Sequence, residues 1–250
     1  MRNKMCGRYT LKTEPDSWGQ LLLPIVEASG QDASSSKPKS EKLSAEWKAE
    51  WQPRFNIAPT QNVFAVRNDR EGEMLLDYFR WGLVPSWAKE LSIGSRMINA
   101  RAETLPEKKS FSGPLKSRRC LVVADGYYEW QRLDDGGKQA CWISPAEGGV
   151  MCLAGLWEAN SKATGEPVQT CTIITTAANQ SLGEIHDRMP VVIDGQALEQ
   201  WMSPKTSGEV AHELLGSADE DYFRVTRVSN FVNRVRNDSP ECIEPQEESK

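Results

Sequence analysis

The sequence predicts a single α+β domain with a mainly antiparallel sheet. Short apolar runs bounded by turn residues dominate the chain beyond residue 60, whereas stretches with helical spacing are few. A chain of 250 residues is also long enough for one sizeable core. Because so few helices cannot cover both faces of a parallel sheet, the antiparallel arrangement is favoured.

In chain order, the first expected element is a helix over 17–26, whose apolar residues have helical spacing and whose last turn Pro24 weakens. The polar stretch 27–50 contains little that can pack, so we expect a mobile insertion or a polar surface helix there. The expected strands beyond it are 63–67, 75–81, 120–124, 140–143, 151–157, 170–176 and 223–228. The expected helices are 181–184, 196–201 and 209–215.

Composition is that of an ordinary intracellular protein, with 39% hydrophobic and 26% charged residues. The six cysteines form no CxxC pair, which predicts reduced thiols and argues against structural zinc. No run approaches the roughly 18 apolar residues of a membrane helix, and the N-terminus lacks a hydrophobic signal core. We therefore expect a cytoplasmic protein.

The net charge of −5 is unevenly distributed. Residues 213–250 hold nine acidic and five basic side chains, whereas 92–119 hold seven basic and only two acidic ones. The second stretch predicts either a local basic surface or simply a solvated charged segment. Composition alone leaves both interpretations open.

Cys6 directly follows Met5, a position in which a cysteine can become the first residue of the chain. If translation starts at Met5 and the methionine is removed, Cys6 carries both a free α-amine and a thiol. Such a residue can capture an aldehyde twice, first as an imine and then by thiol attack to close a thiazolidine ring. Since the chain begins Met1-Arg2, this hypothesis requires a start at Met5 or removal of the first five residues.

Three further clusters carry polar groups that suit catalysis. Asn99, Arg101 and Glu103 are spaced by two, which predicts one shared strand face. Glu129 is expected at the end of an apolar strand among aromatic residues, an environment that favours general acid work. His186, one of only two histidines, lies in a polar turn beside Arg188, just before a strand.

Seven motifs, taken together and in order, resemble the SOS-response-associated peptidase (SRAP) family. They lie at residues 5–9, 54–60, 81–87, 99–104, 118–122, 126–130 and 186–190. The resemblance implies an SRAP-like domain over 6–235, with an antiparallel sheet or distorted barrel and flanking helices. It leaves 1–5 as a leader that is absent or removed, and 236–250 as an acidic flexible tail.

The resemblance also implies a sensor of abasic sites in single-stranded DNA. In this interpretation Cys6 forms a covalent thiazolidine cross-link with the ring-opened deoxyribose aldehyde and protects the site during the DNA damage response. Glu129 protonates the ring oxygen, Asn99 orients Cys6 and the sugar, and His186 relays protons and helps to reverse the adduct. The enzyme class implied is a peptidase, hydrolase or lyase, and the peptidase activity is interpreted as self-processing of the N-terminus.

The same resemblance assigns the DNA contacts. Arginines are expected on phosphates, and aromatic or proline residues are expected to stack on bases or wedge into a kinked strand. The expected contacts are Arg8, Asn56, Pro59, Trp81, Trp87, Arg101 and Arg188. No cofactor and no metal is expected, the protein is expected to act as a monomer, and it associates with the nucleoid when bound to DNA.

Other interpretations stay open at this point. Glu129 also fits a strand-end carboxylate paired with Arg132, and His186 also fits a hydrogen-bonded turn residue. Trp142 and Trp157 are expected in the core. Two other classes of protein also fit: an amidohydrolase with an N-terminal cysteine nucleophile, and a module that binds single strands without chemistry.

Overall fold

The computed structural model describes residues 7–18, 51–69, 72 and 74–246. The expected leader, Cys6, the polar stretch 27–50 and most of the helix expected over 17–26 lie outside these residues. The described N-terminal segment forms strand β1 (Tyr9–Leu11) and a 3-10 turn, η1 (Pro15–Ser17).

The larger sheet has seven strands. Five of them form a closed ring in the order β10-β4-β3-β6-β9, because β10 pairs with both β4 and β9. Two short strands, β5 and β11, extend the sheet from β10. The bounds are β3 (Asn62–Asn68), β4 (Met74–Trp81), β5 (Asn99–Arg101), β6 (Arg119–Ala124), β9 (Met151–Asn160), β10 (Val168–Ala177) and β11 (Arg188–Pro190).

The smaller sheet has five strands in the order β12-β8-β7-β1-β2, and all of its pairings are antiparallel. Its bounds, besides β1, are β2 (Arg54–Ile57), β7 (Gly126–Arg132), β8 (Lys138–Pro145) and β12 (Phe223–Arg227). Among the strands that the structure describes, only β10 with β4 and β10 with β5 run parallel. The expected mainly antiparallel α+β domain with a barrel is therefore confirmed.

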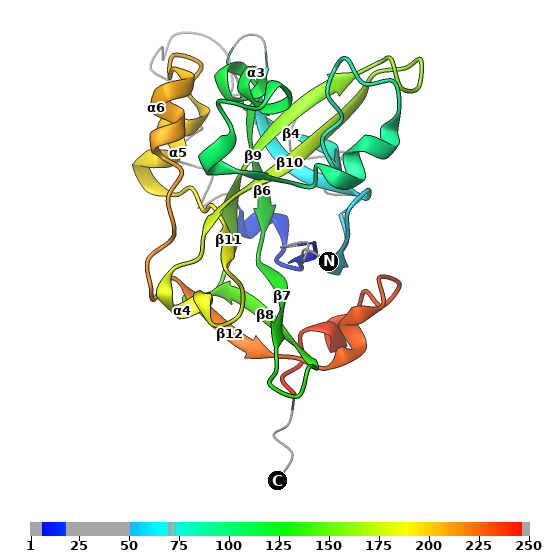
Figure 1. Cartoon of the computed structure of the whole chain (residues 1–250), viewed down its shortest axis with the longest axis vertical. Helices are drawn as coiled ribbons and strands as arrows, with labels where there is room; N and C mark the ends of the chain where they lie inside the picture. The colour runs from blue at the N-terminus through cyan, green and yellow to red at the C-terminus, as the bar shows by residue number, and fades with distance from the viewer. Residues whose placement is uncertain (1–6, 19–50, 70–71, 73, 247–250) are drawn as a thin grey trace.

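The described residues form four α-helices at the periphery: α3 (Lys109–Ser117), α4 (Gln180–Gly183), α5 (Gly195–Met202) and α6 (Gly208–Glu213). Figure 1 shows α3, α5 and α6 gathered at one end, away from β7 and β8. The last three helices overlap the predicted ones, whereas α3 was not predicted, because Gly113 and Pro114 interrupt its pattern. Among the described residues, no helix is both long enough and apolar enough to cross a bilayer.

A tight corner at Asp125 and Gly126 passes the chain from the ring into the smaller sheet. The buried Asp125 carboxylate accepts hydrogen bonds from the N–H groups of Lys12 and Thr13 at 2.6 and 2.7 Å, and from the Thr10 hydroxyl at 2.5 Å. Gly126 has no room for a Cβ, because the Trp142 indole occupies that space. The expectation that Glu129 ends the apolar strand is thus wrong: a new strand, β7, begins at Gly126.

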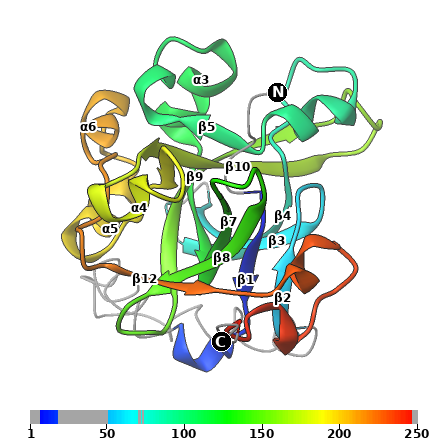
Figure 2. The ribbon, with the colours of Figure 1, turned by 60° about the horizontal axis from the view of Figure 1, so that its bottom comes forward.

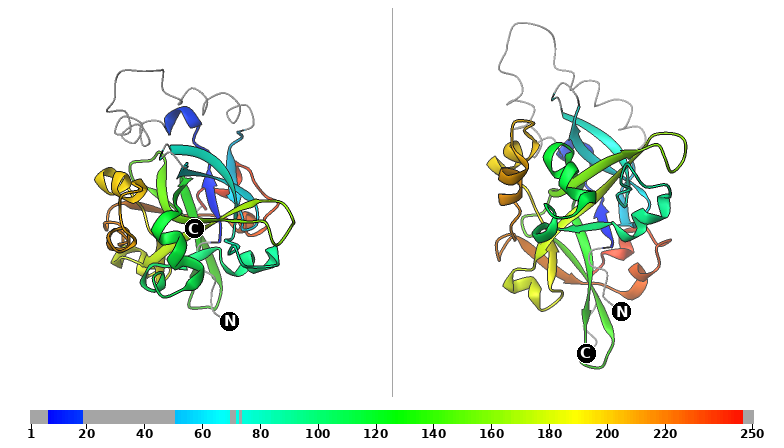
Figure 3. Two further views of the ribbon diagram at one scale, coloured as in Figure 1. Left: turned by 90° about the horizontal axis from the view of Figure 1, so that it is seen from above. Right: turned by 45° about the horizontal axis from the view of Figure 1, so that its top comes forward.

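The C-terminal segment packs on β1 and β2. It contains η5 (Asn230–Asn233) and η6 (Pro240–Cys242), and Figures 2 and 3 show it, in orange and red, beside the blue β1. Asp238 accepts hydrogen bonds from the N–H groups of Phe55 and Asn56 at 2.5 and 2.9 Å, and Cys242 is fully buried. The flexible tail expected from residue 236 is therefore wrong up to residue 246, because these contacts fix the segment.

Candidate functional site

Two of the sequence-predicted residues lie on short strands that pair with the C-terminal half of β10. Asn99 on β5 lies opposite Ile173, and Arg188 on β11 lies opposite Ala177. His186 precedes β11 in a loop whose start is fixed by α4, since the His186 N–H donates to the Leu182 carbonyl at 3.1 Å. Main-chain pairing thus sets where Asn99 and the His186 loop lie along β10.

Strand β7 carries Glu129, which is only 3% exposed. The N–H of Tyr128, the preceding residue, donates to the Arg8 carbonyl at 3.0 Å. On the other side, a Cβ built on Gly7 would lie 4.0 Å from the Cδ1 of Ile98, the residue before Asn99. The chain at residues 7–8 therefore passes between the neighbours of Glu129 and of Asn99.

Cys6 itself lies outside the described residues, but it is bonded directly to Gly7. Gly7 is the first described residue, and it lies near Ile98.

The His186 loop is tied to the strand that carries Glu129. Gln131, two residues after Glu129 and on the same face of β7, donates from Nε2 to the Glu184 carbonyl at 3.3 Å. The sequence analysis missed Gln131, although its spacing of two from Glu129 was a usable signal. This bond links β7 to the turn between α4 and β11.

The imidazole of His186 is positioned by its own turn. Its Nδ1 accepts a hydrogen bond from the Arg188 N–H at 3.1 Å and lies 3.0 Å from the Asp187 carboxylate. Because Nδ1 accepts from a main-chain donor, the neutral ring carries its proton on Nε2. Burial lowers the His186 pKa most, and the Arg188 and Arg132 charges lower it further, whereas the Asp187 charge and the hydrogen bond with the Arg188 main chain oppose them only in part. A ring that is neutral near pH 7 can accept a proton.

Arg188 is engaged by the protein rather than presented to solvent. Its guanidinium forms a two-pronged ion pair with Glu103 and donates to the Thr175 carbonyl at 2.7 Å. The hydrogen bond from Arg188 holds the pKa of Glu103 below its ordinary value. Glu103 lies on the 3-10 turn η4 (Ala102–Thr104), so the expectation of one strand face with Asn99 and Arg101 is wrong: the strand ends at Arg101.

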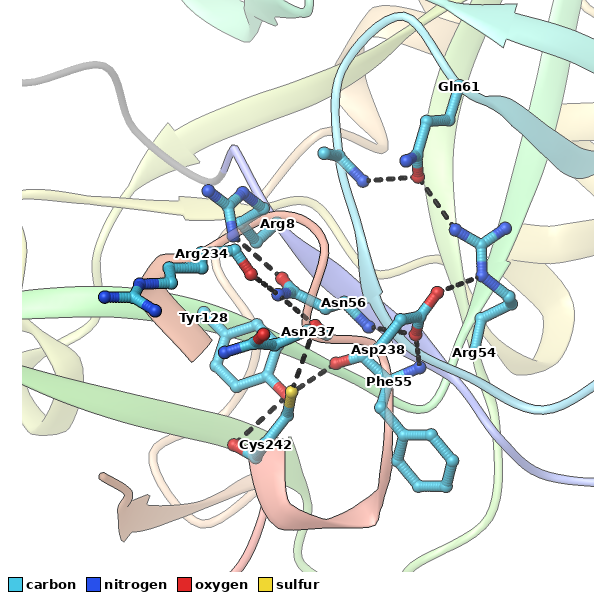
Figure 4. A network of polar contacts seen from close by, with 11 residues as sticks. Arg8, Arg54, Phe55, Asn56, Gln61, Tyr128, Arg234, Asn237, Asp238 and Cys242 are labelled. Carbon is cyan, nitrogen blue, oxygen red and sulfur yellow. Dashed lines mark hydrogen bonds and ion pairs between the residues drawn. The ribbon is translucent and has the colours of Figure 1, made fainter. Parts of the chain in front are cut away.

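Arg8 and Asn56 also contact protein groups (Figure 4). Arg8 donates to Asn56 Oδ1 and to the Val232 carbonyl, both at 2.9 Å. The Asn56 amide is fully buried and donates to the carbonyls of Val232, Arg234 and Asn237. The expected base contact by Asn56 is wrong in this conformation, because no part of its side chain reaches the surface.

The two predicted tryptophans differ sharply. Trp81 is fully buried, donates from Nε1 to the Ile98 carbonyl at 2.9 Å and packs edge-on against Tyr9. Stacking of Trp81 on a base is therefore excluded in this conformation. Trp87 is 55% exposed, Arg101 is exposed and Pro59 is half-buried, so all three present surface to a partner.

The basic stretch 92–119 is only partly a surface. Its exposed members include Arg96, Lys108 and Lys116. Arg119, by contrast, is buried and donates to main-chain carbonyls that include those of Trp201 and Leu115. Arg119 therefore joins α3 and α5 to the ring and is not available to a ligand.

The fold and the site together define a class of protein: an α+β domain in which the start of the first described strand lies against the residues that precede Glu129 and Asn99. The chain belongs to the SOS response associated peptidase (SRAP) family, whose pattern matches residues 5–235. The resemblance drawn from the motifs is thereby confirmed.

Curated relatives in bacteria and vertebrates are similar over most of their length. The abasic site processing proteins YoaM and YoqW of Bacillus subtilis are 44% and 41% identical, and the matches cover 97% and 96% of this chain and 99% of each relative. The abasic site processing protein HMCES of Gallus gallus is 37% identical over 81% of this chain and 69% of its own.

Solved structures share the fold. A protein from Bacteroides thetaiotaomicron has a TM-score of 0.76 at 22% identity, covering 96% of this chain and 100% of that one. A phage-related protein from Bordetella bronchiseptica has a TM-score of 0.65 at 27% identity, covering 89% and 94%. Both likenesses agree with the single-domain α+β fold.

Proposed function

We propose that this chain recognises abasic sites in single-stranded DNA and captures them covalently through Cys6. One observation carries the proposal. The main chain at Gly7 and Arg8, which directly follow Cys6 in the sequence, runs between the residue before Glu129 and the residue before Asn99. The names of the relatives, abasic site processing proteins, supply the substrate class.

The chemistry balances without a cofactor. The α-amine of Cys6 adds to the carbonyl carbon of the ring-opened deoxyribose, and loss of water gives an imine. The thiol sulfur then bonds to the imine carbon, and its proton passes to the nitrogen, which closes a thiazolidine. One molecule of water is released for each adduct, and no bond of the DNA backbone is broken.

The surrounding groups have distinct roles in this proposal. Glu129 donates a proton to the ring oxygen, which opens the closed sugar to the reactive aldehyde. His186 is neutral near pH 7 and accepts protons as the amine adds and water leaves. Asn99 orients the sugar and residue 6 through its amide. Reversal of the adduct uses the same groups in the opposite direction.

DNA contacts are proposed for the side chains that have exposed surface. Arg101 suits a phosphate, and Trp87 and Pro59 suit a base or a kinked strand. Arg8 and Arg188 already donate hydrogen bonds to protein groups, so either arginine must give up such a bond to bind a phosphate. In the free protein we assign them the role of holding neighbouring segments in position. The protein is proposed to act as a cytoplasmic monomer that joins the nucleoid on binding.

The test uses an oligonucleotide with one abasic site and the intact mass of the denatured product. Protein made from Met5, with Met5 removed, is expected to gain the mass of one oligonucleotide minus one water. Cys6→Ala protein is expected to gain nothing. A chain shown to begin at Cys6 that forms no adduct would overturn the proposal.

The same mass measurement tests self-processing. Protein made from Met1 is expected to lose residues 1–5 if the chain processes itself, and Glu129→Gln or His186→Gln protein is expected to keep them. An intact Met1 terminus on protein that nevertheless forms the adduct would show that Cys6 need not be exposed.

A further inference from the structure

Residues 229–237, here called the arginine loop, follow β12 and are bound to the rest of the domain by hydrogen bonds to their main-chain carbonyls. The buried Asn56 amide donates to three carbonyls of the loop, those of Val232, Arg234 and Asn237, at 3.0, 3.1 and 2.7 Å. Arg8 adds two further contacts, to the Val232 and Asn233 carbonyls at 2.9 and 3.3 Å, and these five N–H···O contacts leave the loop backbone little freedom.

Two side-chain hydrogen bonds further fix the loop, one from Trp130 and one between two loop residues. The Trp130 indole donates to Asn233 Oδ1 at 2.7 Å, and the Asn237 amide donates to the Phe231 carbonyl at 2.6 Å. Val232 is fully buried among Tyr128, Ala140 and other apolar residues. The arginine loop is therefore a built surface with a defined conformation.

The exposed side chains of this fixed loop include two apolar and two cationic ones. Phe231 and Val235 are 41% and 44% exposed, and Arg234 and Arg236 are exposed beside them. In Figure 4 the Arg234 side chain extends away from the hydrogen-bond network. Residues 223–237 contain no acidic side chain, although the net charge of 213–250 is negative.

We propose that the arginine loop binds the single-stranded DNA that flanks the abasic site on one side. An exposed aromatic ring followed in the same loop by two exposed arginines suits a strand whose bases are free to stack and whose phosphates are close by. The surface is continuous with the candidate site, because Arg8 bonds to the loop and lies two residues from Cys6. This inference rests on the proposed function and adds a second anchoring point to it.

The test measures binding of fluorescent oligonucleotides that carry tetrahydrofuran, an abasic analogue with no aldehyde. One oligonucleotide extends only 5′ of the analogue and the other only 3′. The variant Phe231→Ala/Arg234→Gln/Arg236→Gln is expected to bind one of them at least about tenfold more weakly and the other normally. The slope of log affinity against log salt is expected to fall by about 1.4 for the affected oligonucleotide, about 0.7 for each lost phosphate contact.

The matched control removes two cations and one exposed apolar side chain elsewhere: Lys109→Gln/Lys205→Gln/Val210→Ala, on the α3–α6 side. It is expected to bind both oligonucleotides like the wild type. Unchanged binding by the loop variant, or equal weakening on both sides, overturns the proposal. A duplex of equal length that binds the loop as tightly as the single strand overturns the choice of partner.

The two proposals fail in different ways. Wild-type protein that begins at Cys6, binds the tetrahydrofuran oligonucleotides and forms no adduct with an oligonucleotide carrying a true abasic site defeats covalent capture and leaves the loop surface standing. Wild-type protein that forms the adduct, together with a loop variant that binds normally, defeats the loop surface alone.

Discussion

The main-chain carbonyl of Arg8 accepts a hydrogen bond from the N–H of Tyr128 at 3.0 Å. This bond continues the antiparallel pairing of β1 with β7, in which Tyr9 lies opposite Tyr127. It fixes the chain two residues after Cys6 against the residue before Glu129. Because the bond is between main-chain groups, substitutions of the Glu129 side chain leave it in place.

Glu129→Gln is expected to slow adduct formation by about 100-fold or more at saturating oligonucleotide, because the acid that opens the sugar is lost. Single-turnover kinetics on a denaturing gel measure the rate. Glu158→Gln is a matched control, since Glu158 is a buried carboxylate that pairs with Arg118 at 3.1 Å. A Glu129→Gln rate equal to that of the wild type would falsify the acid role.

The His186 imidazole is expected to titrate below its ordinary value of 6.5, because burial disfavours its charged form. The chain has only two histidines, so NMR titration of wild-type and His212→Gln protein assigns the signal. A midpoint at or above 6.5 would contradict a neutral base at pH 7.

The same lowered pKa predicts how stability depends on pH. The unfolded imidazole binds its proton first as the pH falls below about 6.5, so the folded state loses stability from there down to the lowered pKa. His186→Gln protein lacks this contribution. We therefore expect the stability difference between wild type and variant to change between pH 7.5 and 5.5, measured by urea unfolding, and a constant difference would count against it.

The ion pair of Arg188 and Glu103 is expected to contribute about 0.5–1 kcal/mol at pH 7, because the Glu103 side chain is half exposed. A double-mutant cycle with Arg188→Gln and Glu103→Gln measures this coupling by urea unfolding. The Glu103 pKa is lowered, so the coupling is fully present above its ordinary value of 4.5 and is lost as the pH falls through the lowered pKa. Equal coupling at pH 7 and pH 2.5 would contradict the pairing.

Trp81 and Trp87 are expected to respond oppositely to substitution. Trp81→Phe removes one of the two donors to the Ile98 carbonyl and leaves a smaller ring in the core, so it is expected to cost about 1–3 kcal/mol of stability. Trp87→Ala is expected to change stability by less than about 0.5 kcal/mol and to weaken DNA binding. Thermal unfolding and anisotropy separate the two effects, and a stable Trp81→Phe protein with weakened binding would reverse the assignment.

Asn56→Ala is expected to cost about 2–4 kcal/mol, because it removes the buried amide that donates to three carbonyls of the C-terminal segment and accepts from Arg8. Asn62→Ala, at an exposed position on β3, is the control and is expected to be nearly neutral. Urea unfolding of the two variants measures the difference, and equal stabilities would show that Asn56 does not hold the segment.

Local pattern predicted the strands of the ring well. The runs at 63–67, 120–124 and 170–176 lie within β3, β6 and β10, because continuous apolar and β-branched stretches are a direct consequence of burial. The three-residue strands β5 and β11 left no such signal, because they exist only by pairing with β10.

Burial of individual polar groups was not predictable in the same way. Asn56, Arg119 and Asp125 have ordinary polar side chains, and the sequence offers no sign that each satisfies buried main-chain groups from distant segments. Trp81 was expected at the surface but lies in the core for the same reason, since its partners Tyr9 and Ile98 come from other segments of the chain.

The sequence by itself determined the fold class, the family and the identity of the chemical groups, because residue types and motif order are local properties of the chain. The tertiary structure decided which of those groups have surface for a partner. Arg101 and Trp87 do, whereas Arg8, Asn56 and Arg188 are engaged by segments up to 225 residues away. Hydrogen-bond partners are chosen by three-dimensional proximity, and no local pattern records that choice.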